Sequence, residues 1–104
     1  MKLEHLTTSD QKLAGLQFRK KLDDNTVLVF WDAKEDDVFH TINCKFSFDI
    51  AFLGKKNTIL GMKLLNPLKK ESIKAPCDTV MVLEANRGFL RDAYSVGKRF
   101  HLNK

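Results

Sequence analysis

The sequence predicts a mainly β protein, a compact antiparallel β-barrel or sandwich with one or two short peripheral helices. The segment from Val38 to Phe52 carries hydrophobic residues at every second position over most of its length, which is the period of a β-strand. Other short apolar segments follow at hairpin spacing. The connections between Thr26 and Leu65 are too short for the helices of a parallel α/β fold. With 104 residues, 43% of them hydrophobic, the chain is expected to form a single domain, 1–104.

A short helix is the first predicted element, from about Ser9 to Lys20. Thr8 and Gln11 have the spacing of a capping box, and apolar residues follow at helical spacing. Gly15 lowers the helix propensity by about 1 kcal/mol relative to alanine. This glycine indicates either close packing or an early end of the helix.

Three features of the central segment predict strands and a hairpin. Thr26–Trp31 is dense in β-branched and aromatic residues, which favours a buried strand. The alternating segment at 38–52 would span about 50 Å if it were straight, so we expect a bend near Lys45–Ser47. Gly54–Asn57 supplies turn residues, and Phe48–Leu65 should therefore form an antiparallel hairpin.

The last third of the chain is expected to form four elements: a basic loop at Pro67–Pro76, a strand at Thr79–Glu84, a short helix at Asn86–Ala93 capped by Asn86, and a last strand at Lys98–Leu102. Glu84 stands at the end of an apolar strand. We expect it to pair with Arg87 or Arg91 rather than to act in catalysis.

Composition limits the partners and the location. The apolar runs are too short to span a bilayer, and the first residues lack the apolar stretch of a secretory signal, so a cytoplasmic protein without membrane association is expected. Cys44 and Cys77 have no second cysteine at zinc-site spacing, which predicts two reduced thiols. We expect no metal, no cofactor and a monomer. Whether the two cysteines lie close enough to pair is left open.

Three segments match the motifs of a known family in order and spacing. They are Gly15-Leu16-Gln17-Phe18-Arg19, the segment from Phe39 to Phe52, and Met81-Val82-Leu83-Glu84 with Gly88. From about Thr8 to Phe100 the chain resembles the domain of unknown function 192 family. The resemblance implies a small β-barrel-like domain without an established activity, found in both exported and intracellular proteins.

The chain also departs from that family's motifs. His40, Thr41, Cys44 and Ser47 replace the family's tryptophan, methionine, threonine and proline, and Gln17 replaces a methionine. These substitutions fall in the half of the motif that is most suited to form a site. The resemblance therefore implies a fold rather than a function.

Arg19, Asn43 and Asp49 match family motif positions and form the tentative ligand-binding site. A guanidinium, an amide and a carboxylate can together fix a small ligand or an anion. In the structural alternative, Arg19 ties the helix to the sheet through Asp49 or a strand carbonyl, and Asn43 satisfies backbone groups at the bend. Because an uninterrupted strand would separate Asn43 from Asp49 by about 20 Å, a shared pocket requires the bend.

These observations favour a non-catalytic module that binds an unknown small ligand or protein partner, with no catalytic residues assigned. The first alternative is a nucleic-acid-binding domain with a basic surface, supported by a net charge of +5. It requires Arg19–Lys21, Lys55-Lys56 and Lys69–Lys74 to share one face. The second alternative is a small hydrolase, which requires His40 and Ser47 within hydrogen-bond reach.

Overall fold

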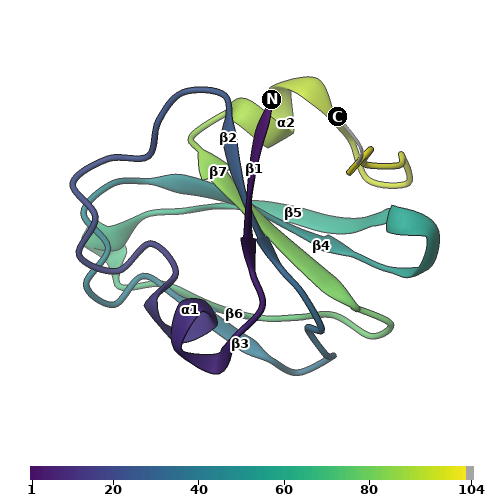
Figure 1. The fold of residues 1–104 in the computed structure, drawn as a ribbon, viewed down its shortest axis with the longest axis horizontal. Coiled ribbons are helices and arrows are strands. Elements are labelled where there is room, and N and C mark those ends of the chain that lie inside the picture. The colour runs from purple at the N-terminus through teal and green to yellow at the C-terminus, as the bar shows by residue number, and fades with distance from the viewer. Residues whose placement is uncertain (103–104) are drawn as a thin grey trace.

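A five-stranded sheet and a two-stranded sheet form most of the computed structural model, which describes residues 1–102 (Figure 1). The elements are β1 (Lys2–Leu6), α1 (Ser9–Ala14), β2 (Thr26–Phe30), β3 (Val38–His40), β4 (Phe48–Leu53), η1 (Lys55–Asn57), β5 (Ile59–Leu65), η2 (Pro67–Lys69), β6 (Ser72–Lys74), β7 (Met81–Asn86) and α2 (Phe89–Ala93). The strand order in the large sheet is β1-β2-β7-β4-β5, and β3 pairs with β6 in the small one. Neither α1 nor α2, nor any other helix within residues 1–102, has the length and hydropathy needed to cross a membrane.

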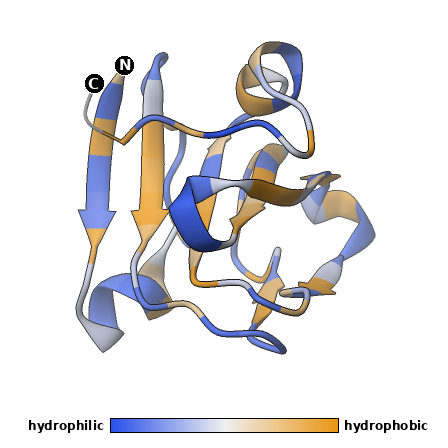
Figure 2. Ribbon diagram, turned by 90° about the vertical axis from the view of Figure 1, so that its right-hand side faces the viewer, coloured by the Kyte–Doolittle hydropathy of each residue, from blue (hydrophilic) through white to orange (hydrophobic). Residues whose placement is uncertain are grey.

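The mainly β prediction is confirmed, and the arrangement is a sandwich rather than a closed barrel. One hydrophobic core fills the space between the large sheet and the β3–β6 pair, where Phe30 and Phe52 of the large sheet meet Phe39 and Ile73 of the small one. Figure 2 shows hydrophobic residues concentrated in the inner strands of the large sheet, whereas the edge strand β1 is banded and the connecting segments are largely hydrophilic. The β3–β6 pair and α1 lie on the same side of the large sheet (Figure 1).

A second core covers the opposite face of the large sheet. Here Val27, Leu83 and Leu90 pack with Phe100, so α2 and the C-terminal segment cover the strands. All six residues of β4 are consequently buried. Alternation of apolar and polar residues is typical of a strand with one face in solvent, but both faces of β4 are covered, and its polar residue Asp49 is buried as well.

The predicted helix ends early, at Ala14, and Gly15 terminates it. The predicted capping box is confirmed, because the Thr8 hydroxyl accepts from Gln11 N at 3.1 Å and Gln11 Oε1 accepts from Thr8 N at 3.1 Å. Gly15 has φ +45°, in the region that favours glycine. A Cβ atom there would lie 3.3 Å from Phe30 Cζ, so close packing and chain reversal both favour glycine.

The long alternating segment divides between the two sheets. Its first part is β3 and its second part is β4, and the residues between them, 41–47, form a turn. The break therefore begins earlier than the predicted bend at Lys45–Ser47. The predicted hairpin is confirmed, since β4 pairs antiparallel with β5 from Phe48 opposite Leu65 to Leu53 opposite Ile59.

Two strands lie where the sequence predicts none. β1 pairs parallel with β2, and α1 lies in the connection between them. β6 lies within the segment at Pro67–Pro76 that is predicted as a loop, and it pairs antiparallel with β3. The sheet is otherwise antiparallel, as expected.

The C-terminal third differs from expectation at two points. Asn86 belongs to β7 and donates from Nδ2 to Leu22 O at 2.8 Å, whereas Gly88 is the N-cap of α2. The predicted cap is therefore wrong. The predicted last strand at Lys98–Leu102 is also wrong, because within the described residues this segment makes only a single bridge, from Arg99 to Thr58.

Candidate functional site

Glu84 lies in the middle of the large sheet, on the central strand β7. The pairing register places it beside Leu28 of β2 and Ile50 of β4, both fully buried. Directly paired residues project to the same face of a sheet, so Glu84 points toward the core between the large sheet and the β3–β6 pair. Its side chain and backbone together are only 4% exposed.

No hydrogen bond and no ion pair reaches the Glu84 carboxyl within residues 1–102. No polar side-chain atom in this part of the chain is both unpaired and fully shielded from solvent, so the carboxyl oxygens face open space. That space is a cavity of about 120 Å³, which we call the Glu84 pocket. Buried polar groups in proteins are almost always hydrogen-bonded. An unpartnered buried carboxyl that opens onto a cavity is therefore the feature of this structure most suggestive of a site.

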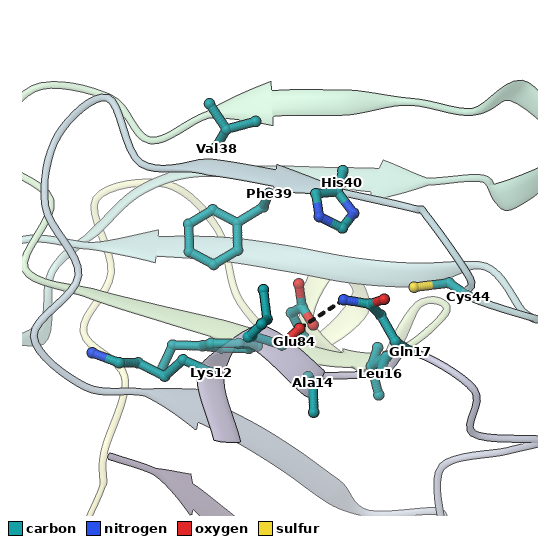
Figure 3. Close-up of a pocket in the computed structure, with 12 residues that line it drawn as sticks. Lys12, Ala14, Leu16, Gln17, Val38, Phe39, His40, Cys44 and Glu84 are labelled. Carbon is teal, nitrogen blue, oxygen red and sulfur yellow. Dashed lines mark hydrogen bonds between the residues drawn. The ribbon is translucent and has the colours of Figure 1, made fainter. Parts of the chain in front are cut away.

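Besides Phe30 of β2 and Glu84 itself, the wall of the pocket comes from three segments (Figure 3). The α1 segment and the residues after it contribute Lys12 and Gln17, β3 contributes Phe39 and His40, and the 41–47 turn contributes Cys44. The Gln17 amide is occupied, because Nε2 donates to the Leu13 carbonyl at 2.7 Å. His40 Nδ1 accepts from Ile42 N at 3.1 Å. The Lys12 ammonium donates to the Trp31 carbonyl at 3.1 Å, outside the pocket.

The electrostatics of the pocket are dominated by burial. Loss of hydration raises the pKa of Glu84 to about 8, and the positive charge of Arg19 partly opposes this change. At neutral pH the carboxyl is therefore mostly protonated. Burial and the nearby Glu84 charge raise the pKa of the Cys44 thiol to about 11. At neutral pH Glu84 and Cys44 are thus both neutral, and the Lys12 ammonium is directed to the Trp31 carbonyl rather than to Glu84.

Asp49, on the opposite face of the sheet, is a matched contrast to Glu84. It is fully buried and accepts three hydrogen bonds, from Leu90 N at 3.1 Å, from Arg91 N at 3.0 Å and from Arg91 Nε at 2.8 Å. Asp49 therefore holds the start of α2 against β4. The predicted pairing of Glu84 with Arg87 or Arg91 is wrong, because Arg91 pairs with Asp49 and neither arginine reaches Glu84.

The three residues predicted for a ligand site do not meet. The Arg19 guanidinium pairs with Glu4 and donates from Nε to Gly15 O at 3.1 Å, which fixes the segment after α1 to β1. Asn43 adopts φ +59° and donates from Nδ2 to Gln17 Oε1 at 3.1 Å. Arg19 and Asn43 thus each support a residue of the Glu84 pocket wall, whereas Asp49 lies on the other face. A direct role in ligand binding stays a prediction for all three.

The structure bears on the geometry that each alternative function requires. Lys55 and Lys56 precede β5, and Lys69 and Lys70 follow it, so the two pairs lie at opposite ends of a seven-residue strand, roughly 23 Å apart. These two pairs therefore do not form one contiguous basic cluster. Within residues 1–102, no hydrogen bond joins the side chains of His40 and Ser47. The nucleic-acid and hydrolase interpretations gain no support from the structure.

Glu84 was not among the residues predicted to form a site. The sequence contains a signal that could have identified it. Glu84 interrupts an otherwise apolar strand, and its alternation with Val82 places it on the inner face of that strand. An acid at such a position is buried on the inner face of the strand. A basic residue that follows in sequence but lies on the opposite face of the sheet cannot pair with it.

Comparisons with known proteins give a family and two related structures. The family model DUF192, described as uncharacterized ACR, matches residues 1–101. A protein of unknown function from Novosphingobium aromaticivorans DSM 12444 is 26% identical, with a TM-score of 0.82 over 93% of this chain and 71% of that one. A candidate transcription regulator from Sinorhizobium meliloti 1021 is 22% identical, with a TM-score of 0.82 over 93% of this chain and 78% of that one; at this identity it supports the fold alone. No curated protein is significantly similar to the chain.

Proposed function

The chain belongs to the domain of unknown function 192 family, a family of uncharacterized proteins, and from this premise we propose that it is a non-catalytic binding module whose Glu84 pocket holds the positively charged group of a ligand. One observation carries the proposal. Glu84 is buried, has no partner within residues 1–102, and opens onto a cavity. A bound cation would supply the missing partner.

The chemistry of the wall suits an alkylammonium group. Phe30 and Phe39 line the pocket, and the faces of aromatic rings attract cations. A buried carboxylate gains most from a partner that also satisfies its lone pairs by hydrogen bonds, as an ammonium does. A cavity of about 150 Å³ accommodates the six carbons of benzene. The Glu84 pocket, at about 120 Å³, therefore has room for about five non-hydrogen atoms.

The state of the other pocket residues supports binding rather than catalysis. Cys44 carries the most nucleophilic atom in the wall, but its raised pKa of about 11 keeps it a thiol. His40 Nδ1 is occupied by the Ile42 amide. Within residues 1–102, the pocket therefore contains no activated nucleophile next to a base.

The remaining parts of the proposal concern location and supporting residues. We place the protein in the cytoplasm, because Cys44 and Cys77 are both free thiols. Arg19 and Asn43 act indirectly in this proposal, since they hold Gly15 and Gln17 of the pocket wall. The ligand is a small molecule or a protein that carries an amine.

Isothermal titration calorimetry with n-butylamine between pH 6 and 9 tests the proposal. A cation binds the ionised carboxyl, so binding must remove the proton that Glu84 holds below about pH 8. We expect the affinity to rise about tenfold per pH unit up to pH 8 and then to level off, because an alkylammonium keeps its charge up to about pH 10. Below pH 7, each ligand bound should release one proton.

The charged and titratable groups around Glu84 define the controls. They are Lys12 on α1, Arg19 after it, His40 on β3 and Cys44 in the turn. Glu84→Gln should abolish binding at every pH, whereas Glu35→Gln, the same change at an exposed glutamate, should leave the profile unchanged. Affinity that falls as the pH rises through 8 would show that the protonated carboxyl donates to the ligand, and it would overturn the proposal.

A further inference from the structure

The outer edge of β3 is free of backbone pairing. β3 belongs to a two-stranded sheet, and among residues 1–102 it pairs only with β6. Asp37 O accepts from Ala75 N at 2.7 Å and Thr41 N donates to Glu71 O at 3.0 Å, so alternate residues from 37 to 41 face β6. The N–H and C=O groups of Val38 and His40 consequently face the other edge. Within the described chain, no further backbone hydrogen bond reaches them.

This free edge lies along the mouth of the Glu84 pocket. In Figure 3, β3 runs above the pocket, with Val38, Phe39 and His40 along it, and the α1 segment lies below. The pocket continues into a neighbouring hollow at each end of β3. The hollow of about 310 Å³ shares Lys12, Phe30 and Phe39 with the pocket. The hollow of about 600 Å³ shares His40 and Cys44 with it.

Large apolar side chains are exposed around this groove. Leu13 is 72% exposed, Phe18 69%, Ile42 61% and Val38 54%. Leu13 and Val38 line the pocket itself, and Ile42 lines the larger hollow. Phe18 lies beside that hollow, because its amide donates to Asn43 O at 2.8 Å. Exposed apolar residues gathered around a cavity are typical of surfaces that bind another protein.

We propose that the ligand of this module is an extended segment of a partner protein, which adds as a strand to the free edge of β3 and inserts a lysine side chain into the Glu84 pocket. This inference rests on the proposed function and names its ligand. Strand addition supplies backbone hydrogen bonds, and pockets for alternate side chains supply specificity. The residues two before and two after the lysine project to the same side, so apolar residues there cover the two flanking hollows.

Size and shape favour lysine over arginine. The lysine side chain has four methylene groups and one ammonium, which matches the room for about five non-hydrogen atoms in the pocket. The methylene groups would contact Phe39 and Leu16 of the wall. The arginine side chain is longer and ends in a planar fork that exceeds this space.

Binding of synthetic peptides at pH 8.5, measured by calorimetry, tests the inference. The probe is acetyl-Val-Thr-Lys-Thr-Val-amide, and the matched control replaces its lysine by norleucine, which keeps the chain length and removes the charge. We expect the lysine peptide to bind at least tenfold more tightly than n-butylamine, and the norleucine peptide to lose at least tenfold in affinity. Two further peptides carry N-methyl groups on one or the other set of alternate amides. Only one of them should lose binding, because a strand pairs through one edge at a time.

The outcomes separate this inference from the proposed function. If n-butylamine binds in a Glu84-dependent manner and the lysine peptide binds no more tightly, the partner segment is wrong and the amine pocket stands. If the norleucine peptide binds as well as the lysine peptide, or both N-methylated peptides keep full affinity, strand addition with lysine insertion is wrong. If neither n-butylamine nor the peptide binds, both proposals fall.

Discussion

The buried carboxyl of Glu84 should make the protein less stable as the pH rises. In the unfolded chain this group ionises near its ordinary pKa of 4.5, whereas in the folded protein its pKa is about 8. Between these values the folded state holds one proton more than the unfolded state, so the free energy of unfolding falls by about 1.4 kcal/mol per pH unit. From pH 5 to pH 7.5 the loss through Glu84 amounts to about 3 kcal/mol. At pH 8 this contribution to the slope is halved, and about one pH unit higher it disappears.

Urea unfolding followed by the fluorescence of Trp31, the single tryptophan, measures this effect. The histidines titrate in the same range, so the quantity to compare is the stability difference between wild type and Glu84→Gln at pH 5 and at pH 7.5. We expect this difference to change by about 3 kcal/mol in favour of the variant. Glu35→Gln should show no such change. Parallel pH profiles for wild type and Glu84→Gln would refute the reasoning, because Glu84 would then ionise as it does in water.

Three other changes test the geometry around the site. Asp49→Asn should lower the free energy of unfolding, measured by urea titration, by about 3 kcal/mol, because it weakens three hydrogen bonds to a buried carboxylate. A loss below about 0.5 kcal/mol would contradict the role of Asp49 at the start of α2. Gly15→Ala should lower the melting temperature by several degrees. Alanine at a positive φ and its Cβ contact with Phe30 should together reduce the free energy of unfolding by about 1–2 kcal/mol. An unchanged melting temperature would show that alanine is not strained at this position. Iodoacetamide at pH 8 should alkylate the exposed Cys77 well before the half-buried Cys44, as peptide mass spectrometry would show, and equal rates would contradict the burial of Cys44.

Local sequence patterns correctly predict those elements that are stabilised by contacts between residues close together in the chain. The capping box at Thr8 and the hairpin between β4 and β5 depend on residues close together in the chain, and both are confirmed. Gly15 likewise indicates the end of α1 because its backbone conformation is a local property. The fold class follows from such elements, since short strands at hairpin spacing favour a layered β structure.

Elements that depend on distant partners are the ones that the sequence does not reveal. β1 forms a strand because β2 lies beside it, although its own sequence alternates poorly. Asn86 looks like a helix cap, but β7 continues through it and its side chain bonds to Leu22 O. The segment at Lys98–Leu102 has the apolar residues of a strand, yet its residue Phe100 packs into the second core without strand pairing along the segment. Tertiary packing overrides local propensity in each case.

The candidate site was missed for a related reason. Charge pairing was predicted from proximity in sequence, which links Glu84 to Arg91. Strand periodicity places the two residues on opposite faces of the sheet. Glu84 faces the β3–β6 pair, whereas Arg91 forms its ion pair with Asp49 on the other face. Which face an acid occupies can be read from alternation, but the absence of a partner across the core depends on the whole fold.

The most direct test of a cation site at Glu84 is an NMR titration of its side-chain carboxyl carbon, first in the free protein and then with saturating n-butylamine. We expect a midpoint near pH 8 in the free protein, and a midpoint at least one pH unit lower with the amine, because a bound cation favours the ionised carboxyl. A midpoint near 4.5 in the free protein, or a midpoint that the amine leaves unchanged, would contradict the assignment of this pocket as the binding site.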